Sequence, residues 1–198
     1  MVALTEAIAA SGDDGDVVDT TFNSSKVNLE VGNSMAGQPS RFFCRFTTVT
    51  IPAGATIDDA KLQFICDVTT SDSFAITIRG DDSDNPSAYT NTSAITSATL
   101  TTASVAWTPG AKSADATVDS PEIKTVIQEI VDRSGWGSGN AMIIHVIYNG
   151  ESVSAEAIKF SSQDHGSDTE PQLILNYTPP ASAVGGTTQK TLVLGMFG

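Results

Sequence analysis

Short apolar runs separated by turn-forming residues recur along most of the chain. This spacing is typical of an antiparallel β-sandwich or barrel, whereas a parallel α/β fold would alternate strands with long helices. The clearest run alternates strictly, with Leu62, Phe64, Cys66 and Val68 on one face and polar residues between them. We therefore predict an all-β antiparallel sandwich with strands over residues 17–22, 27–31, 41–49, 61–68, 74–79, 104–107, 141–148, 157–161 and 172–177.

The run MIIHVIY at residues 142–148 has no polar alternation apart from His145. A strand that is apolar on both faces is expected at the centre of a sheet, covered from both sides. His145 is therefore interpreted as a hydrogen-bonded core histidine in preference to a catalytic base. The helix described next is a candidate for one of the two covers.

The segment DSPEIKTVIQEIVDRSG at residues 119–135 breaks the strand pattern and indicates one short α-helix. Ser120 is placed to be the N-cap, Pro121 the first helical residue, and Glu122 lies near the positive end of the helix dipole. Gly135 is expected to end the helix. The apolar residues at helical spacing predict a lid across one end of the sandwich, and they are Ile123, Val126, Ile127, Ile130 and Val131.

Both ends of the chain predict extended tails. Residues 1–15 are mostly small, polar or acidic, and indicate an N-terminal arm that becomes ordered only against another surface. The sandwich domain is assigned to residues 16–178, and residues 179–198 form a Pro/Gly/Thr-rich linker with an apolar end. We expect the apolar end to dock on its own domain or on a neighbouring subunit, and its residues are Leu192, Val193, Leu194, Met196 and Phe197.

The chain has 23 acidic and 10 basic side chains, which gives a formal net charge of −13. Nucleic acid is not an expected partner, because binding to it requires clustered lysines and arginines. We also expect no membrane partner and no signal peptide, since no apolar run reaches the required length. Cys44 and Cys66 lie in strand patterns and are interpreted as buried free thiols, with a cross-strand disulfide as the alternative.

The chemistry-bearing residues offer little for catalysis. No motif of a serine hydrolase, a zinc protease or a phosphate-binding loop occurs, and the chain has only two histidines. His165 lies in a loop with Asp164, Asp168 and Glu170, a grouping that could hold a metal or transfer protons but that exposed acidic turns also show. We therefore expect a protein that is not an enzyme and requires no cofactor.

A structural calcium ion is the alternative to that expectation, because clustered carboxylates in turns are typical calcium ligands. No cluster has the spacing of an EF-hand loop, so a solvated turn is the preferred interpretation of each. The three clusters are Asp13, Asp14 and Asp16; Asp81, Asp82 and Asp84; and Asp164, Asp168 and Glu170.

Aromatic side chains could provide flat faces on which sugar rings stack. Trp107 lies in a strand pattern and Trp136 follows the predicted helix, so partly buried anchors are the preferred interpretation of both. Tyr89, in the sequence NPSAYTN, is the better candidate for an exposed ring.

Three segments carry a family resemblance, and they are IPAGATIDDAKLQF, SPEIKTVIQEIVDRSGWGSGNAMIIHV and EPQLILNYT. In order and spacing they resemble the DNRLRE-type domains of extracellular bacterial proteins and phage structural proteins. The resemblance covers roughly residues 16–178 and is most specific in the helix and in the Gly135–Asn140 stretch after it. It implies a jelly-roll sandwich, similar to carbohydrate-binding modules, with a non-catalytic role.

These observations lead to two hypotheses of function. The leading one is a virion structural protein, such as a capsid decoration or cement protein, that forms a homo-oligomer and contacts other virion proteins such as the capsid shell. The tails and a fold of extracellular type without a signal peptide favour it. The alternative is a carbohydrate-binding module or an adhesin that recognises surface glycans, either extracellular or at a cell surface.

Overall fold

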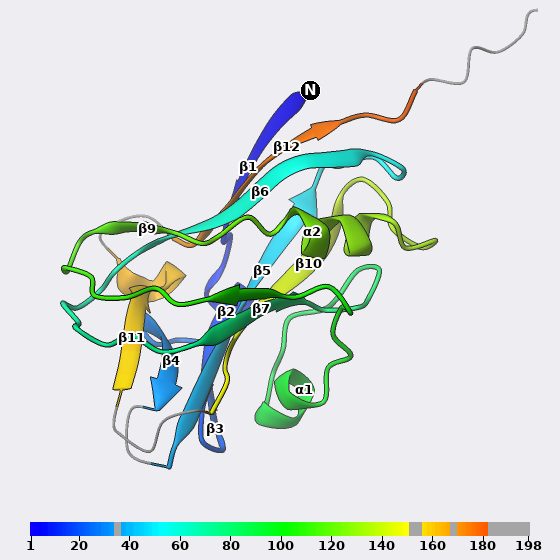
Figure 1. Cartoon of the computed structure of the whole chain (residues 1–198). Helices are drawn as coiled ribbons and strands as arrows, with labels where there is room; N and C mark the ends of the chain where they lie inside the picture. Colours follow the sequence, from blue (N-terminus) through cyan, green and yellow to red (C-terminus); the bar gives the residue numbers. More distant parts are fainter. Residues whose placement is uncertain (34–36, 151–155, 167–169, 182–198) are drawn as a thin grey trace, which may run out of the picture.

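The structure is a computed structural model that describes residues 1–33, 37–150, 156–166 and 170–181. Two antiparallel sheets face each other, so the predicted all-β sandwich is confirmed (Figure 1). The smaller sheet has the order β1-β12-β6-β9, and its strands are β1 (Val2–Ala7), β12 (Gln172–Thr178), β6 (Thr56–Ile65) and β9 (Thr117–Asp119).

The larger sheet has the order β11-β4-β5-β10-β7-β8. In addition, β2 pairs with β5 next to β4, and β3 pairs with β2. The strands are β2 (Asp14–Val18), β3 (Thr21–Asn23), β4 (Asn28–Asn33), β5 (Pro39–Val49), β7 (Ile76–Gly80), β8 (Val105–Trp107), β10 (Asn140–Tyr148) and β11 (Glu156–Ser161). The strand predicted over residues 17–22 is thus divided by a turn, in which Asp19 has a φ of 54°.

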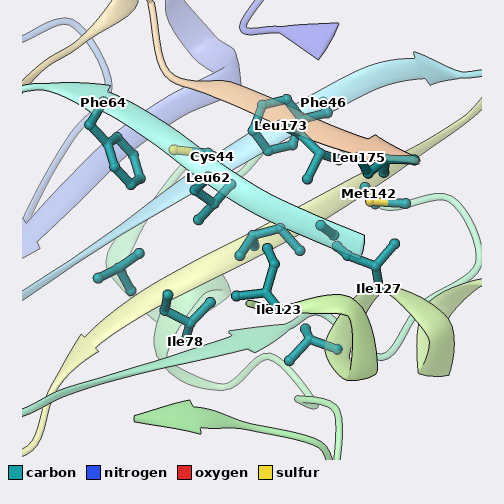
Figure 2. Close-up of a cluster of buried hydrophobic side chains, with 14 of the residues drawn as sticks. Cys44, Phe46, Leu62, Phe64, Ile78, Ile123, Ile127, Met142, Leu173 and Leu175 are labelled. Carbon is teal, nitrogen blue, oxygen red and sulfur yellow. The ribbon is translucent and has the colours of Figure 1, made fainter. Parts of the chain in front are cut away.

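Alternate side chains of both sheets meet in the main core, as period-two alternation requires (Figure 2). From β5 the inward residues are Phe42, Cys44 and Phe46, whereas Phe43 points to the opposite face. Figure 2 shows Cys44 and Phe46 beside Leu62 and Phe64 of β6 and Leu173 and Leu175 of β12. Cys44 and Cys66 are buried and unbonded, which confirms the interpretation as free thiols.

The helix α2 (Lys124–Val131) begins later than predicted. Ser120 is not its N-cap, because the Ser120 hydroxyl accepts a hydrogen bond from the Leu62 amide and donates to the carbonyl of Pro121. Ile123 occupies the N-cap position without a side-chain hydrogen bond. Glu122 accepts from the amide of Lys124 and so satisfies one free N–H at the start of the helix.

The apolar stripe of α2 is buried in the main core, as predicted. The helix packs against β6 and β7, so it fills the side of the sandwich between these two strands. Gln128 of α2 accepts a hydrogen bond from the amide of Ile57, and Glu122, just before the helix, accepts one from the amide of Ala60. These two side chains satisfy amides at the edge of β6. The helix was expected to cover one end of the sandwich, but it packs along its side, between β6 and β7.

The outer face of β10 is covered by residues 81–101, and α2 instead faces the main core. This segment contains α1 (Thr92–Thr96), a helix that the sequence analysis did not predict. A second, smaller apolar cluster forms beneath it and consists of Val17, Phe43, Ile95 and Ile143 with Phe22 and Tyr89 at its edge. Two short 3-10 helices, η1 (Ser11–Asp13) and η2 (Gln163–His165), complete the described elements.

The first residues of the chain form part of the sandwich. Strand β1 pairs with β12 along its whole length, from Val2 opposite Tyr177 to Ala7 opposite Gln172 (Figure 1). Residues 14 and 15 already lie in β2. The prediction of a separate N-terminal arm over residues 1–15 is therefore wrong, whereas the predicted apolar tail at residues 192–197 lies outside the described residues.

Candidate functional site

Trp107 and Trp136 are core anchors. Trp107 is 7% exposed, and its ring stacks on Phe64 and Phe160 at centroid distances of 6.2 and 6.0 Å. Trp136 is 4% exposed, and its indole N–H donates to the carbonyl of Ile51 at 3.0 Å. Neither ring offers an open face for stacking on a sugar, so the anchor interpretation holds for both.

Tyr89, the candidate for an exposed aromatic face, is half-buried against the larger sheet. Its ring makes an edge-on contact with Phe43 at a centroid distance of 4.9 Å. Its hydroxyl donates to Asp81 and lies 3.0 Å from Nε2 of His145. Burial and the neighbouring Asp81 carboxylate raise the pKa of Tyr89, which keeps the hydroxyl protonated. Tyr89 therefore fixes the covering segment to the sheet.

His145 is fully buried and hydrogen-bonded, as the sequence analysis predicted. Burial, with a smaller contribution from Arg41, lowers the pKa of His145 to about 3. Its other ring nitrogen, Nδ1, has no hydrogen-bond partner within the part of the chain that the structure describes. A neutral imidazole without a path to solvent is a structural group and a poor proton carrier near neutral pH.

The acidic cluster at residues 81–84 is engaged in ion pairs. Arg133, just after α2, pairs with Asp82 and with Asp84, the latter at 2.7 Å. Asp81 accepts the hydroxyl of Tyr89 instead. The cluster therefore ties the segment after β7 to the end of α2, and its carboxylates are already paired with protein groups.

The acidic cluster at residues 13–16 is buried, so its interpretation as a solvated turn is wrong. Asp14 and Asp16 are each 1% exposed. Asp13 pairs with Arg45 at 2.5 Å, and Asp16 pairs through Oδ2 with Lys26 at 2.7 Å. The reason for the burial is that residues 14 and 16 occupy β2, paired with the central strand β5.

Asp14 forms no ion pair with the described residues, and its Oδ2 accepts a hydrogen bond from the amide of Gln163 at 2.9 Å. Desolvation, reinforced by the negative charges of Asp164, Asp13 and Asp16, raises the pKa of Asp14 to about 7. Desolvation also raises the pKa of Asp16, against the effect of Lys26. Among the described carboxyl groups, Asp14 therefore has the largest pKa shift.

The third predicted cluster is described only in part. Asp164 accepts the hydroxyl of Ser11 at 2.7 Å, and His165 Nε2 lies 2.9 Å from Asp67. Asp168 lies outside the described residues. In residues 1–33, 37–150, 156–166 and 170–181, no group of three or more His, Cys, Asp or Glu residues is arranged to hold a metal ion. In the same residues, no helix is long and apolar enough to span a membrane.

Two further charged residues were missed by the sequence analysis. Glu30 is buried in β4, where it lies 3.4 Å from Lys159 of β11. Arg41 lies half-buried in β5 on the outer face of the larger sheet. The alternation of Arg41, Phe43 and Arg45 against the inward residues was the available signal, since an apolar residue between two arginines indicates a face that is partly covered.

No family model matches this chain, and none of the curated proteins matches it in sequence. The resemblance to DNRLRE-type domains therefore stays a prediction from the residues quoted above.

Proposed function

We propose that the protein is a non-catalytic structural subunit of a virus particle, a decoration or cement protein that acts through contacts with neighbouring subunits and with the capsid shell. The observation that carries the proposal is the position of β1. This strand is an outer edge of the smaller sheet, directly beside β12, and the chain continues from β12 towards the apolar segment at residues 191–198.

Strand β1 pairs on one side only among the described residues. Its other side presents backbone N–H and C=O groups that a further strand could pair with. The start of this edge is also apolar and solvent-exposed, since Met1 is 81% and Val2 40% exposed. An open edge with exposed apolar side chains supports a role in subunit contacts.

The C-terminal sequence supplies a partner of suitable length and character. A flexible linker of about a dozen residues has an end-to-end distance of roughly 20 Å, enough to reach an adjacent subunit. Burying three or four of the apolar side chains would contribute several kcal/mol at about 25 cal/mol per Å², reduced by the entropy of ordering the linker. Repeated around a symmetric oligomer, this gain would stabilise the assembly.

A non-catalytic role is supported by the state of the histidines and carboxylates. His145 is neutral and enclosed, His165 contacts Asp67, and the carboxylates of residues 81–84 contact Tyr89 and Arg133. The alternative of glycan recognition by ring stacking loses its support, because Trp107 and Trp136 are buried and Tyr89 is packed against Phe43.

The test compares the full chain with a chain that ends at Thr178 and with the full-length variant Leu192→Asp/Leu194→Asp/Phe197→Asp. Sedimentation equilibrium and binding to purified capsid shells are measured. We expect both altered proteins to melt at the same temperature as the full chain and to lose oligomerisation or shell binding. A full chain that neither oligomerises nor binds shells would contradict the proposal. So would a shortened chain that loses thermal stability but assembles normally.

A further inference from the structure

Arg41 is the one basic side chain of the described residues that has no hydrogen bond or ion pair. The other arginines contact Asp13, Thr101, Asp82 and Asp84, and the described lysines contact Asp16, Asp119, Pro109, Asp58 and Glu30. In a protein with a net charge of −13, a cation without a partner is unexpected. The missing partner indicates that Arg41 binds an anionic group of a ligand.

The position of Arg41 keeps it partly away from water. Strand β5 places it between Val17 of β2 and Ile147 of β10, on the face opposite to the main core. Burial lowers the pKa of Arg41, so desolvation disfavours its charge without a compensating anion. A bound anion would remove this penalty, and a carboxylate suits the planar guanidinium because it can accept two parallel hydrogen bonds.

Arg41 lines a pocket with about 310 Å³ of empty space, counted out to its mouth. The walls come from the turn between β2 and β3, the start of β5, the end of α1 and the end of β10. Thr92 of α1 donates to the carbonyl of Thr20 at 2.8 Å, which holds α1 against the turn. Only about 70 Å³ of this space is enclosed, less than the roughly 300–1,000 Å³ of small-molecule pockets, so the pocket holds the charged end of a ligand. The rest of the ligand would lie at the mouth, where Asp19 and Thr96 are exposed.

Apart from Tyr148, whose hydroxyl can also donate, the other polar side chains of the pocket offer acceptor oxygens to a ligand. Asp19 contributes a carboxylate that forms no ion pair with Arg41, and its Oδ2 lies 3.5 Å from the hydroxyl of Thr20. The hydroxyls of Ser40 and Thr96 donate to the carbonyls of Gly32 and Thr92, so their oxygen lone pairs remain for a ligand. A matching ligand needs an anionic group for the guanidinium and hydroxyl donors for these oxygens.

We propose that this pocket binds a small hydroxy carboxylate of the sugar-acid class, with its carboxylate on Arg41 and its hydroxyl groups on Asp19 and Thr96. A phosphate fits less well, because it brings more negative charge towards Asp19 and no hydroxyl donor. A neutral sugar leaves the charge of Arg41 uncompensated. The inference does not depend on the proposed role in a virus particle.

The test follows the side-chain Nε–H signals of the four arginines by NMR in the full chain. The probes are sodium glucuronate, glucose, which has the same ring without a carboxylate, and acetate, which has a carboxylate without hydroxyls. We expect glucuronate to shift the Arg41 signal in a saturable way, and glucose and acetate to bind about tenfold more weakly or less, a difference of about 1.4 kcal/mol.

Three variants locate the contacts. Arg41→Gln should abolish glucuronate binding, whereas Lys61→Gln, which removes the same charge from the Asp119 ion pair on the smaller sheet, should leave it unchanged. Asp19→Asn should weaken glucuronate binding relative to acetate binding, because acetate has no hydroxyl group to donate to residue 19 and only loses the repulsion from the Asp19 charge. Equal binding of glucose would overturn the role of the carboxylate, and equal binding of acetate would overturn the role of the hydroxyls. Absence of a saturable shift in the unaltered chain would overturn the site, whether or not Arg41→Gln folds.

Discussion

The hydroxyl of Tyr89 lies 3.0 Å from Nε2 of His145, and this contact joins the segment over residues 81–101 to the centre of the larger sheet. Tyr89→Phe keeps the ring contact with Phe43 but removes the hydroxyl from His145 and Asp81. We expect a loss of about 1–3 kcal/mol in the free energy of unfolding, because both groups lose a buried hydrogen-bond partner. Denaturant titration would measure it.

Tyr177→Phe is the matched control, since the Tyr177 hydroxyl makes a 3.3 Å contact with the carbonyl of Thr50. A single neutral hydrogen bond of this length should contribute less than about 1 kcal/mol. Equal losses in the two variants would show that the hydrogen bonds around His145 contribute no more to the free energy of unfolding than a single neutral hydrogen bond.

The stability of the protein should depend on pH through Asp14. Its pKa is about 7 in the folded chain and near 3.8 when unfolded, so the folded state binds more protons between these values. The contribution of Asp14 is therefore fully present below pH 4 and is lost as the pH rises through about 7. Asp14→Asn should match the parent near pH 4 and exceed its stability at pH 8 by a few kcal/mol, since one pKa unit corresponds to about 1.4 kcal/mol.

Asp119→Asn provides a control of opposite sign. A hydrogen bond from Lys61 lowers the pKa of Asp119, so its contribution is present above the unfolded pKa and is lost in acid. Chemical denaturation at several pH values would separate the two. Parallel stability curves for the parent and Asp14→Asn between pH 4 and 7 would refute the role of Asp14.

The stripe of α2 should tolerate no charge. Ile127 is fully buried in the main core, and Ile127→Asp should unfold the domain or cost at least about 3 kcal/mol. Thr125 is exposed on the same helix, so Thr125→Asp should change the melting temperature little. A soluble Ile127→Asp protein with unchanged melting would contradict the packing of α2.

Removal of calcium should not affect the fold. The carboxylates at residues 13–16 and 81–84 are paired with Lys26, Arg45 and Arg133 or are shielded from solvent. We expect the melting temperature measured by calorimetry to be the same with and without a chelator. A decrease of many degrees would reveal a structural ion, since a ligand bound only to the folded state stabilises it.

The sequence predicted the sandwich well because strand alternation and the stripe of α2 are local patterns. It did not predict the start of α2, because a serine hydroxyl can satisfy a strand amide as well as a helix amide, and Ser120 bonds Leu62. Strand β1 was missed for a different reason. Its short sequence VALTEA contains Glu6, and only the pairing with β12 makes it a strand.

The candidate site was harder to predict, because ion pairs across the fold decide which charges are buried. Asp16 is buried beside Lys26, which comes from the segment between β3 and β4, and Asp13 beside Arg45 of β5. Conversely, the isolation of Arg41 becomes visible only when every other described basic residue has a partner. Neither relationship leaves a periodic signal in the chain.

The pairing of β1 with β12 means that the smaller sheet is assembled from opposite ends of the chain. During synthesis the backbone of β1 stays without its β12 partner until β12 has left the ribosome. Contacts of such large sequence separation slow folding and expose the unfinished intermediate to aggregation. Cotranslational folding of this protein should therefore finish in one late step, and nascent chains that stop before Gln172 should remain protease-sensitive at their N-terminus.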